Sequence, residues 1–376
     1  MTRAAAGGPS EVLGQRALNR AFMARQLMIH RSPIGVTEAI EHLVGLQGQV
    51  PLVPYTSLWS RLEPFDPDEL GRLVAERAVV RTSLMRGTIH MVTARDALFL
   101  RPLLQPVLER VLRQSSPFGR AVAGVDEAAL FATGRALVEA RPLTRAALSA
   151  GLAEGFPGYD PLSLAYMVAG LIPMVQVPPR GVWGAKSIQA TWTTMSSWLD
   201  APVGPAKPKD LETMVLRYLA AFGPASVMDI QSWCWLTKLG AVVERLRPQL
   251  RTFIDENGRE LFDVPDGPLP DPETPIPPRF LGEYDNLFLS HADRSRIGAI
   301  DLAERNFRKG PFFVDGFGHG CWDMVRDGSR ATVVVEPFRP LSPADRIAVG
   351  EEAERLLAFL APGADSRDVR FDGEFA

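Results

Sequence analysis

Two glutamines separated by a single glycine make the segment 46–51 (LQGQVP) the best candidate for a reactive site in this chain. The residues before it have the pattern of a helix end, and Gly48 and Pro51 mark the point where that helix must stop. In extended backbone, side chains at positions i and i+2 point to the same side, so we expect Gln47 and Gln49 to face one small volume. A carboxamide both donates and accepts hydrogen bonds, so such a pair could hold a water molecule without a charge or a metal. The alternative is that both glutamines are solvated loop residues.

Basic and imidazole side chains in three other segments are candidates for contact with nucleic acid. One segment is a predicted strand-turn-strand ribbon, the second is the polar stretch 283–297, and the third is the basic run 305–310. Arginine suits phosphate and base-edge contacts because its guanidinium is planar and bidentate. The candidate DNA-binding residues are Arg86, His90, His291, Arg294, Arg296, Arg308 and Lys309. The alternatives are a backbone-satisfied histidine at position 90 and solvated loops elsewhere. Asp285 and Asn286 are predicted to form a structural turn that caps backbone groups.

One supersecondary unit, three helices followed by a two-stranded ribbon, is predicted to occur three times. In the first unit (12–95), helices are expected at 18–30, 35–44 and 67–76, and strands at 79–84 and 88–92. In the second (125–195), helices are expected at 126–139, 144–151 and 161–170, and strands at 174–177 and 182–183. In the third (208–265), helices are expected at 209–221, 226–235 and 240–246, and strands at 250–255 and 259–264. This order is the winged-helix arrangement, which favours DNA contact and alternatively serves in protein-interaction modules.

A small β-barrel-like domain is predicted over 279–362, after a proline-rich connector at 265–278. Short strands with glycine turns are expected at 288–289, 297–300, 311–317, 320–325 and 331–337. A last helix is expected from Ser342 to Leu360, and the residues after Pro362 are expected to be disordered or loosely attached. The predicted fold class is therefore α+β: three tandem winged-helix units followed by a small β-barrel-like domain and a C-terminal helix.

The composition, 376 residues with 46% hydrophobic and 23% charged, is typical of an ordinary soluble globular protein. No apolar run could cross a membrane and no secretion signal is evident, so we expect a cytoplasmic protein. A net charge of −3 argues against a general nucleic-acid coat protein but is compatible with a local basic face. Only five of the 41 basic residues are lysines, which we attribute mainly to a GC-rich coding sequence.

Sequence motifs of the common cofactor enzymes and hydrolases are absent. The chain has no phosphate-binding loop, no His-Glu-x-x-His and no Gly-x-Ser-x-Gly, and its five histidines lack metal-ligand spacing. Two cysteines cannot form a cysteine-rich zinc site. We therefore expect no cofactor and no metal.

Four segments together resemble the bacterial AlkZ/YcaQ family of winged-helix DNA glycosylases, in the same order along the chain. These segments are 18–20 (LNR), 46–49 (LQGQ), 86–90 (RGTIH) and 285–294 (DNLFLSHADR), and the resemblance extends over about residues 18–360. It implies a monofunctional enzyme that excises bulky N7-alkylated purines or unhooks interstrand crosslinks in double-stranded DNA. It further implies that Gln47 and Gln49 are the catalytic pair of the Gln-x-Gln branch, a branch that includes enzymes for self-resistance to genotoxins. We expect a monomer.

The chemistry that this resemblance implies is physically reasonable. An N7-alkylated guanine is already cationic, so it leaves as a neutral base and needs little acid assistance. The remaining task is to stabilise an oxocarbenium-like sugar and to place a water near C1′. A regulator or adduct-sequestering DNA-binding protein without catalysis is the second hypothesis, and a scaffold without DNA affinity is the third.

Overall fold

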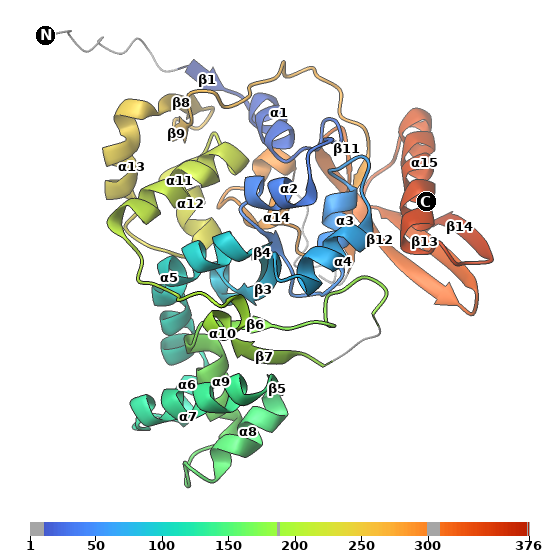
Figure 1. Cartoon of the computed structure of the whole chain (residues 1–376). Helices are drawn as coiled ribbons and strands as arrows, with labels where there is room; N and C mark the ends of the chain where they lie inside the picture. Colours follow the sequence, from blue (N-terminus) through green and yellow to red (C-terminus); the bar gives the residue numbers. More distant parts are fainter. Residues whose placement is uncertain (1–10, 186–188, 299–308, 374, 376) are drawn as a thin grey trace, which may run out of the picture.

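The fold is α+β, with helices and three sheets, in a computed structural model that describes residues 11–185, 189–298, 309–373 and 375. A six-stranded sheet has the order β2-β4-β3-β6-β7-β5, a three-stranded sheet the order β1-β8-β9, and a five-stranded sheet the order β10-β11-β12-β13-β14. Figure 1 shows the helices α7 and α8 at one end of the molecule and the five-stranded sheet with α15 along one side. None of the described helices is long and apolar enough to span a bilayer.

The first unit contains the predicted helices and ribbon together with one short helix that was not predicted. Its elements are α1 (Gln15–Arg25), α2 (Val36–His42), β2 (Leu46–Gln47), α3 (Val53–Trp59), α4 (Pro67–Ala75), β3 (Val79–Ser83) and β4 (Ile89–Thr93). The unpredicted helix α3 is only seven residues long and carries a proline in its first turn, so it has too few turns to show a helical period.

A long helix that the sequence did not reveal, α5 (Ala94–Arg110), follows the first unit. Its pattern is broken by Pro102 and Pro106, which remove backbone donors from the helix interior. The helix forms because Leu100, Leu104 and other apolar residues bury one face in the core. It continues into a π-helical turn, η2 (Val111–Ser115), and the short α6 (Pro117–Ala121).

The second unit has its three predicted helices, but the prediction for its second strand was wrong. The elements are α7 (Glu127–Ala140), β5 (Leu143–Thr144), α8 (Arg145–Ala153), α9 (Pro161–Leu171), β6 (Met174–Gln176) and β7 (Thr191–Thr194). The predicted strand at 182–183 is instead a loop, in which the backbone N–H of Trp183 donates to the hydroxyl of Tyr55 at 3.0 Å. The ring of Trp183 lies 5.0 Å from that of Tyr55, so these residues pack against the first unit.

The third unit follows α10 (Met195–Leu199) and agrees with its prediction. It comprises α11 (Pro208–Phe222), α12 (Val227–Cys234), α13 (Gly240–Leu246), β8 (Arg251–Asp255) and β9 (Glu260–Asp263). Ser226 and Asp229 form a capping box at the start of α12. The strand β1 (Glu11–Leu13) adds to this ribbon in parallel with β8.

The three units share one order of elements: a helix, a short strand or single bridge, two helices, and two antiparallel strands. In each unit the first short strand pairs with the last strand, as β2 with β4, β5 with β7, and Ala225 with Phe262. The first two units are joined because β3 pairs with β6, with Arg81 opposite Gln176 and Thr82 opposite Val175. Their relative orientation is therefore fixed by a common sheet.

The C-terminal region is a five-stranded sheet covered by one helix. It contains β10 (Arg279–Phe280), α14 (Asn286–Leu289), η4 (Ser295–Ile297), β11 (Gly310–Val314), β12 (Phe317–Asp327), β13 (Arg330–Pro337), α15 (Pro343–Leu360) and β14 (Ser366–Phe371). Among the described residues no pairing closes β14 on β10, so the expected barrel is an open sheet.

Three predictions for this region need correction. The strand predicted at 288–289 is helical, because the side chain of Asp285 caps the backbone N–H of Leu287 at 3.0 Å. The tail after Pro362 was predicted to be loose, but β14 pairs in parallel with β13 over six residues. Of the strand predicted at 297–300, Ile297 ends a 3-10 turn, and positions 299–300 lie outside the described residues.

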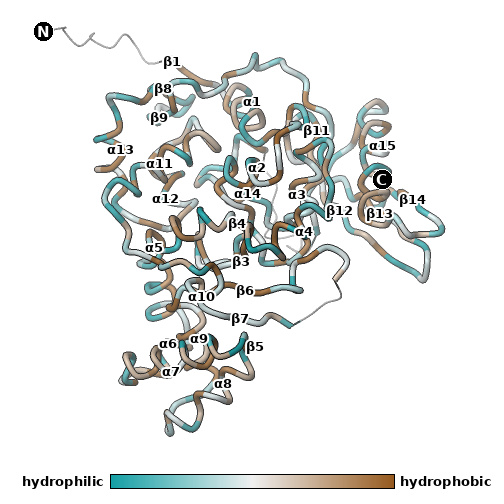
Figure 2. The backbone as a smooth tube through the Cα atoms, in the orientation of Figure 1, coloured by the Kyte–Doolittle hydropathy of each residue, from teal (hydrophilic) through white to brown (hydrophobic). Residues whose placement is uncertain are grey.

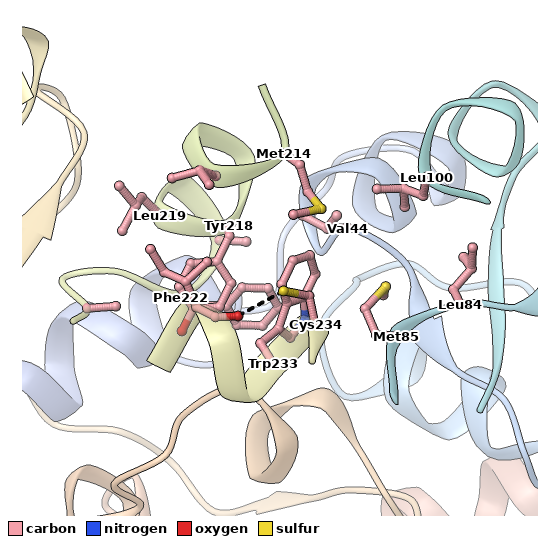
Figure 3. Close-up of a cluster of buried hydrophobic side chains, with 14 of the residues drawn as sticks. Val44, Leu84, Met85, Leu100, Met214, Tyr218, Leu219, Phe222, Trp233 and Cys234 are labelled. Carbon is pink, nitrogen blue, oxygen red and sulfur yellow. Dashed lines mark hydrogen bonds between the residues drawn. The ribbon is translucent and has the colours of Figure 1, made fainter. Parts of the chain in front are cut away.

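The largest hydrophobic core lies where α1, α5, α11 and α12 meet. Tyr218, Phe222, Trp233 and Cys234 pack there at 1% exposure or less, as Figure 3 shows. Burial raises the pKa of the Cys234 thiol to about 12, and both cysteines are buried and form no disulfide with each other. In Figure 2 the chain changes between hydrophilic and hydrophobic residues within single helices, as amphipathic helices do.

Candidate active site

The Gln-Gly-Gln element begins on the last residue of β2, at one edge of the six-stranded sheet. The helix α2 ends at His42, before Val44 and Gly45 turn the chain with φ of 54° and 91°. Gln47 then pairs with His90 of β4, and the N–H of Gly48 donates to the carbonyl of Ile89 at 2.8 Å. The sheet therefore holds the backbone of this element in place.

The spacing had predicted that the two carboxamides face one small volume, but in the structure they do not. Gln47 is 4% exposed, and its Oε1 accepts a hydrogen bond from the backbone N–H of Gln49 at 3.1 Å. Gln49 is exposed, and its Oε1 accepts from the backbone N–H of Ile89 at 3.2 Å. Gln47 therefore braces the turn from inside, while Gln49 faces outward.

Asp285 and Asn286 have the structural role that was predicted for them, and they act on the Gln-Gly-Gln element. Asn286 accepts from the backbone N–H of Gln47 at 3.1 Å and donates to the carbonyl of Gly45 at 2.5 Å. The carboxylate of Asp285 accepts hydrogen bonds from Nη2 and Nη1 of Arg61, at 2.7 and 2.9 Å. Burial by itself would raise the pKa of Asp285, but the charge and hydrogen bonds of Arg61 hold it below its usual value.

Arg81 is a further buried side chain that fixes this element, and no feature of the sequence pointed to it. It is 1% exposed, and its Nη2 donates to the carbonyl of Gly48 at 2.7 Å. Its Nε donates to Oε1 of Gln176 at 3.3 Å, across the junction between the first two units. Burial, together with the nearby charge of Arg180, lowers the pKa of Arg81 to about 10, so it remains a cation at neutral pH. In the sequence it sits within an apolar strand pattern, where a buried charge is not expected.

A cavity of about 280 Å³ opens beside Gln49, between the sheet and the helices α5, α6 and α9, and we name it the Gln49 hollow. A second hollow of about 220 Å³ shares Gln49, Ile89, Arg145, Gln176 and Trp192 with it. No acidic side chain is among the described residues that line the two hollows. The exposed carboxamide therefore borders a space in which arginines are the only charged groups among the described lining residues. This favours an anionic ligand such as a DNA backbone.

Of the predicted DNA-binding residues, His90 lies inside the protein and Arg86 is half-buried. The guanidinium of Arg86 donates to the backbone carbonyls of Trp233 and Leu289, and burial lowers its pKa to about 10. His90 is fully buried, and burial lowers its pKa to about 3, so the ring is neutral at physiological pH. This burial argues against direct DNA contact and gives both residues a part in positioning the ribbon.

Two residues of the predicted hairpin loop, His291 and Arg296, are buried as well. His291 lies between the hydroxyl of Ser290 at 2.9 Å and the carbonyl of Phe222 at 3.0 Å, and burial lowers its pKa to about 3. Arg296 is 5% exposed and donates to the carbonyl of Pro224 at 3.0 Å. Both bind the loop to the third unit and leave little surface for DNA.

The remaining candidates differ in accessibility. Arg294 is exposed and has no ion-pair partner among the described residues. Lys309 is half-buried and forms an ion pair with Glu336. Arg308 lies outside the described residues. Arg145, which was not predicted, lines both hollows.

Comparison with known proteins points to one family. The family model "DNA glycosylase AlkZ-like" matches residues 40–359, which include the Gln-Gly-Gln element. An interstrand DNA cross-link repair glycosylase of Streptomyces sahachiroi is 23% identical over 256 residues, covering 64% of this chain and 64% of that relative, less than two thirds of its length. The solved structure of the Streptomyces sahachiroi DNA glycosylase AlkZ matches 96% of this chain and 100% of its own, with a TM-score of 0.73 and 20% identity. At that identity the structural likeness shows a common fold.

Proposed function

The chain belongs to the family of AlkZ-like DNA glycosylases, and we propose that it hydrolyses the N-glycosidic bond of N7-alkylated purines in double-stranded DNA, interstrand crosslinks included. The observation that carries the proposal is the exposed carboxamide of Gln49, which follows a backbone segment held by the sheet, Asn286 and Arg81. It borders a hollow that has no acidic side chain among its described lining residues.

The three repeated units are proposed to be winged-helix modules that track a duplex. Their shared order of elements and the pairing of first and last strands in each unit support this assignment. The common sheet of the first two units would hold them at a fixed spacing along the DNA.

In the proposed mechanism Gln49 contacts the reacting water and Gln47 acts through it. The Oε1 of Gln49 is held by the backbone of Ile89, and among the described residues its Nε2 has no partner. This amide group can therefore bind and orient a water near C1′. Gln47 is a positioning residue in this geometry, because its carboxamide fixes the backbone of Gln49. The leaving base is already cationic, so no general acid is required of the two neutral glutamines.

DNA contact is proposed for the accessible cations. Arg294 and Arg145 would bind phosphate, and Lys309 would do so in exchange for its ion pair with Glu336. Arg308 is retained as a proposed phosphate contact from the sequence alone.

An excision assay tests the proposal. Duplexes that carry a single N7-methylguanine, or one N7-linked interstrand crosslink, are incubated with the protein and analysed for released base and alkali-labile abasic sites. We expect release by the wild type and by Gln249→Ala, an exposed control glutamine, and strong loss in Gln49→Ala. Full activity in the double variant Gln47→Ala/Gln49→Ala would refute the catalytic assignment.

The burial of Gln47 favours one alternative, a protein that binds adducts without cutting them. It predicts salt-dependent binding of adducted duplex with no base release in the same assay.

The proposed biological role is to protect the cell that makes this protein against a DNA-alkylating toxin. Deleting the gene should then sensitise its source organism to such agents.

A further inference from the structure

The second hollow beside Gln49, the one of about 220 Å³, has a mainly polar lining, and we name it the Arg145 hollow. Its polar lining consists of amide and guanidinium side chains, namely Gln49, Arg145, Gln176, Arg180 and Gln189. Its volume lies below the range of about 300 to 1,000 Å³ that is usual for small-molecule sites. It therefore suits a small polar group better than a whole base.

The side chain of Arg145 is held in place by an aromatic pair. Its guanidinium carbon lies 4.1 Å from the ring centroid of Tyr166, and its Nη1 donates to the hydroxyl of that residue at 3.0 Å. Phe118 stacks on the other face of the same ring, with centroids 3.7 Å apart and planes 7° from parallel. Among the described residues neither Nε nor Nη2 of Arg145 has a hydrogen-bond partner. The guanidinium is thus fixed in position and still has donors for a ligand.

The amide of Gln176 is oriented so that its nitrogen is left to donate. The Nε of Arg81 lies 3.3 Å from Oε1 of Gln176, and because a guanidinium can only donate, the amide atom that faces it must be the oxygen. Within the described part of the chain, Nε2 of Gln176 has no partner. Arg81 also donates to the carbonyl of Gly48 at 2.7 Å, so one buried cation orients Gln176 and the segment before Gln49.

The groups that remain free in the Arg145 hollow are hydrogen-bond donors. Arg145 and Gln176 offer N–H groups, and no acidic side chain is among the described lining residues. A phosphodiester matches this set, because its non-bridging oxygens are anionic and only accept hydrogen bonds. The edge of a base carries donors as well as acceptors and would match it less well.

The reacting sugar has a need for negative charge that the glutamines do not meet. When the bond from C1′ to the base breaks, its electron pair stays on the N7-alkylated purine, which leaves as a neutral molecule, and positive charge develops on the sugar. Gln47 and Gln49 are neutral, and an arginine without a counter-ion would repel that charge. A phosphate bound to Arg145 would offset the arginine and bring an anionic oxygen to the sugar.

We propose that the Arg145 hollow binds one phosphodiester of the damaged nucleotide through Arg145 and Gln176, and that this phosphate supplies the negative charge beside the reacting sugar. The position of the sugar rests on the proposed function, in which Gln49, a residue that borders the same hollow, holds the water near C1′. The two phosphates of a nucleotide are attached to its own sugar, so one of them reaches this hollow. Phe118 and Tyr166 are positioning residues, because they act through Arg145.

A scan with neutral phosphate analogues tests this proposal on the full chain. Each duplex carries one N7-methylguanine and one methylphosphonate linkage, which replaces an anionic oxygen by a methyl group, and the linkage is moved one phosphate at a time along the damaged strand. The dissociation constant and the single-turnover rate of base release at saturating protein are measured for each duplex. The proteins are the wild type, Arg145→Gln, Gln176→Leu and the control Arg135→Gln, whose arginine is exposed and paired with Glu139 outside the hollow.

We expect a single position at which the analogue weakens binding by the wild type and slows base release, each by about tenfold or more. Arg145→Gln should weaken binding of the unmodified duplex to a similar degree but cost little more at that position, because the contact is already lost there. Gln176→Leu should show the same pattern with a smaller effect. Arg135→Gln should have little effect, and the same effect at every position.

The remaining outcomes separate the site, its electrostatic role and the proposed function. Equal losses at every position, or a loss at one position that adds in full to those of Arg145→Gln and Gln176→Leu, would overturn the phosphate site. A loss of affinity at one position with an unchanged rate of base release would overturn the electrostatic role and keep the site. If the wild type shows the binding pattern but releases no base, the proposed function is rejected and the phosphate site stands, whereas absence of binding to every duplex rejects both.

Discussion

The substitution Asn286→Asp changes one functional group in the contact that fixes the Gln-Gly-Gln element. The side-chain nitrogen that donates to the carbonyl of Gly45 at 2.5 Å becomes an oxygen, while the oxygen that accepts from the N–H of Gln47 is kept. An ionised carboxylate at this site, 4% exposed, faces the Gly45 carbonyl without a proton between them. The lost donor and the unsatisfied carbonyl together should lower the free energy of unfolding by about 1–3 kcal/mol.

The loss should depend on pH. Burial and the neighbouring carboxylate of Asp285 both disfavour the charged form, so the new carboxyl has a raised pKa in the folded state. Once protonated, it can donate to Gly45 again. The cost is therefore absent below the unfolded pKa of about 3.9, grows as the pH rises through the folded pKa, and then stays constant.

Urea unfolding and base release, each at about pH 5 and about pH 8, measure the two effects. The difference between variant and wild type at the same pH should be larger at the higher pH, and excision should fall in parallel because a shift of about 1 Å can cost about 100-fold. Asn257→Asp, at an exposed turn position, provides the matched control. A loss that is the same at both pH values, or that equals the control, would refute the reasoning.

Three other outcomes follow from the same geometry. Gln49→Ala should slow base release by about 100-fold or more in single-turnover assays, and Gln47→Ala should slow it less, because only the former removes the group that contacts the water. Arg145→Gln should weaken binding of adducted duplex and reduce the slope of log affinity against log salt by about 1, whereas Arg135→Gln, whose arginine is paired with Glu139, should change it little. His90 is neutral with a pKa of about 3, so excision should show no imidazole titration near pH 6.5, and stability should fall as the pH drops below that value because the unfolded ring binds a proton first.

Elements with their own local signals were predictable from the sequence. Asp126 and Thr144, at which two of the predicted helices begin, accept from the backbone N–H groups of Ala129 and Ala147, as residues of these types do at helix N-termini. The helix α5 was not predicted, because Pro102 interrupts the helical sequence pattern. The burial of apolar side chains in the core compensates for the cost of that proline. Local propensity carries no information on that burial.

The residues of the candidate site could be named from the sequence, but the arrangement of their side chains could be predicted only in part. The sequence placed Gln47 and Gln49 on a common side, but the hydrogen bond from the Gln49 backbone to Gln47 decides which carboxamide is accessible. The partner of Gln47, Asn286, lies 239 residues away in the chain. A basic residue in a loop was predicted to be a surface group, and the burial of Arg296 depends on its packing against the distant third unit.

The abundance of arginine has a structural use that composition alone could not reveal. Arg25 joins the first unit to the third through Asp263 at 2.6 Å, and Arg101 holds the carbonyl of Gly170 at 3.1 Å. With Arg61 and Arg81, these side chains are among the largest fully buried groups of the protein. A guanidinium can serve two or more acceptors at once, which a lysine ammonium on its flexible stem does with less geometric definition. Because so many arginines bond to other segments of the chain, neither the number of arginines nor the net charge of −3 tells how many cations could contact DNA. That number depends on accessible cations such as Arg145 and Arg294, and it can be measured from the salt dependence of DNA binding.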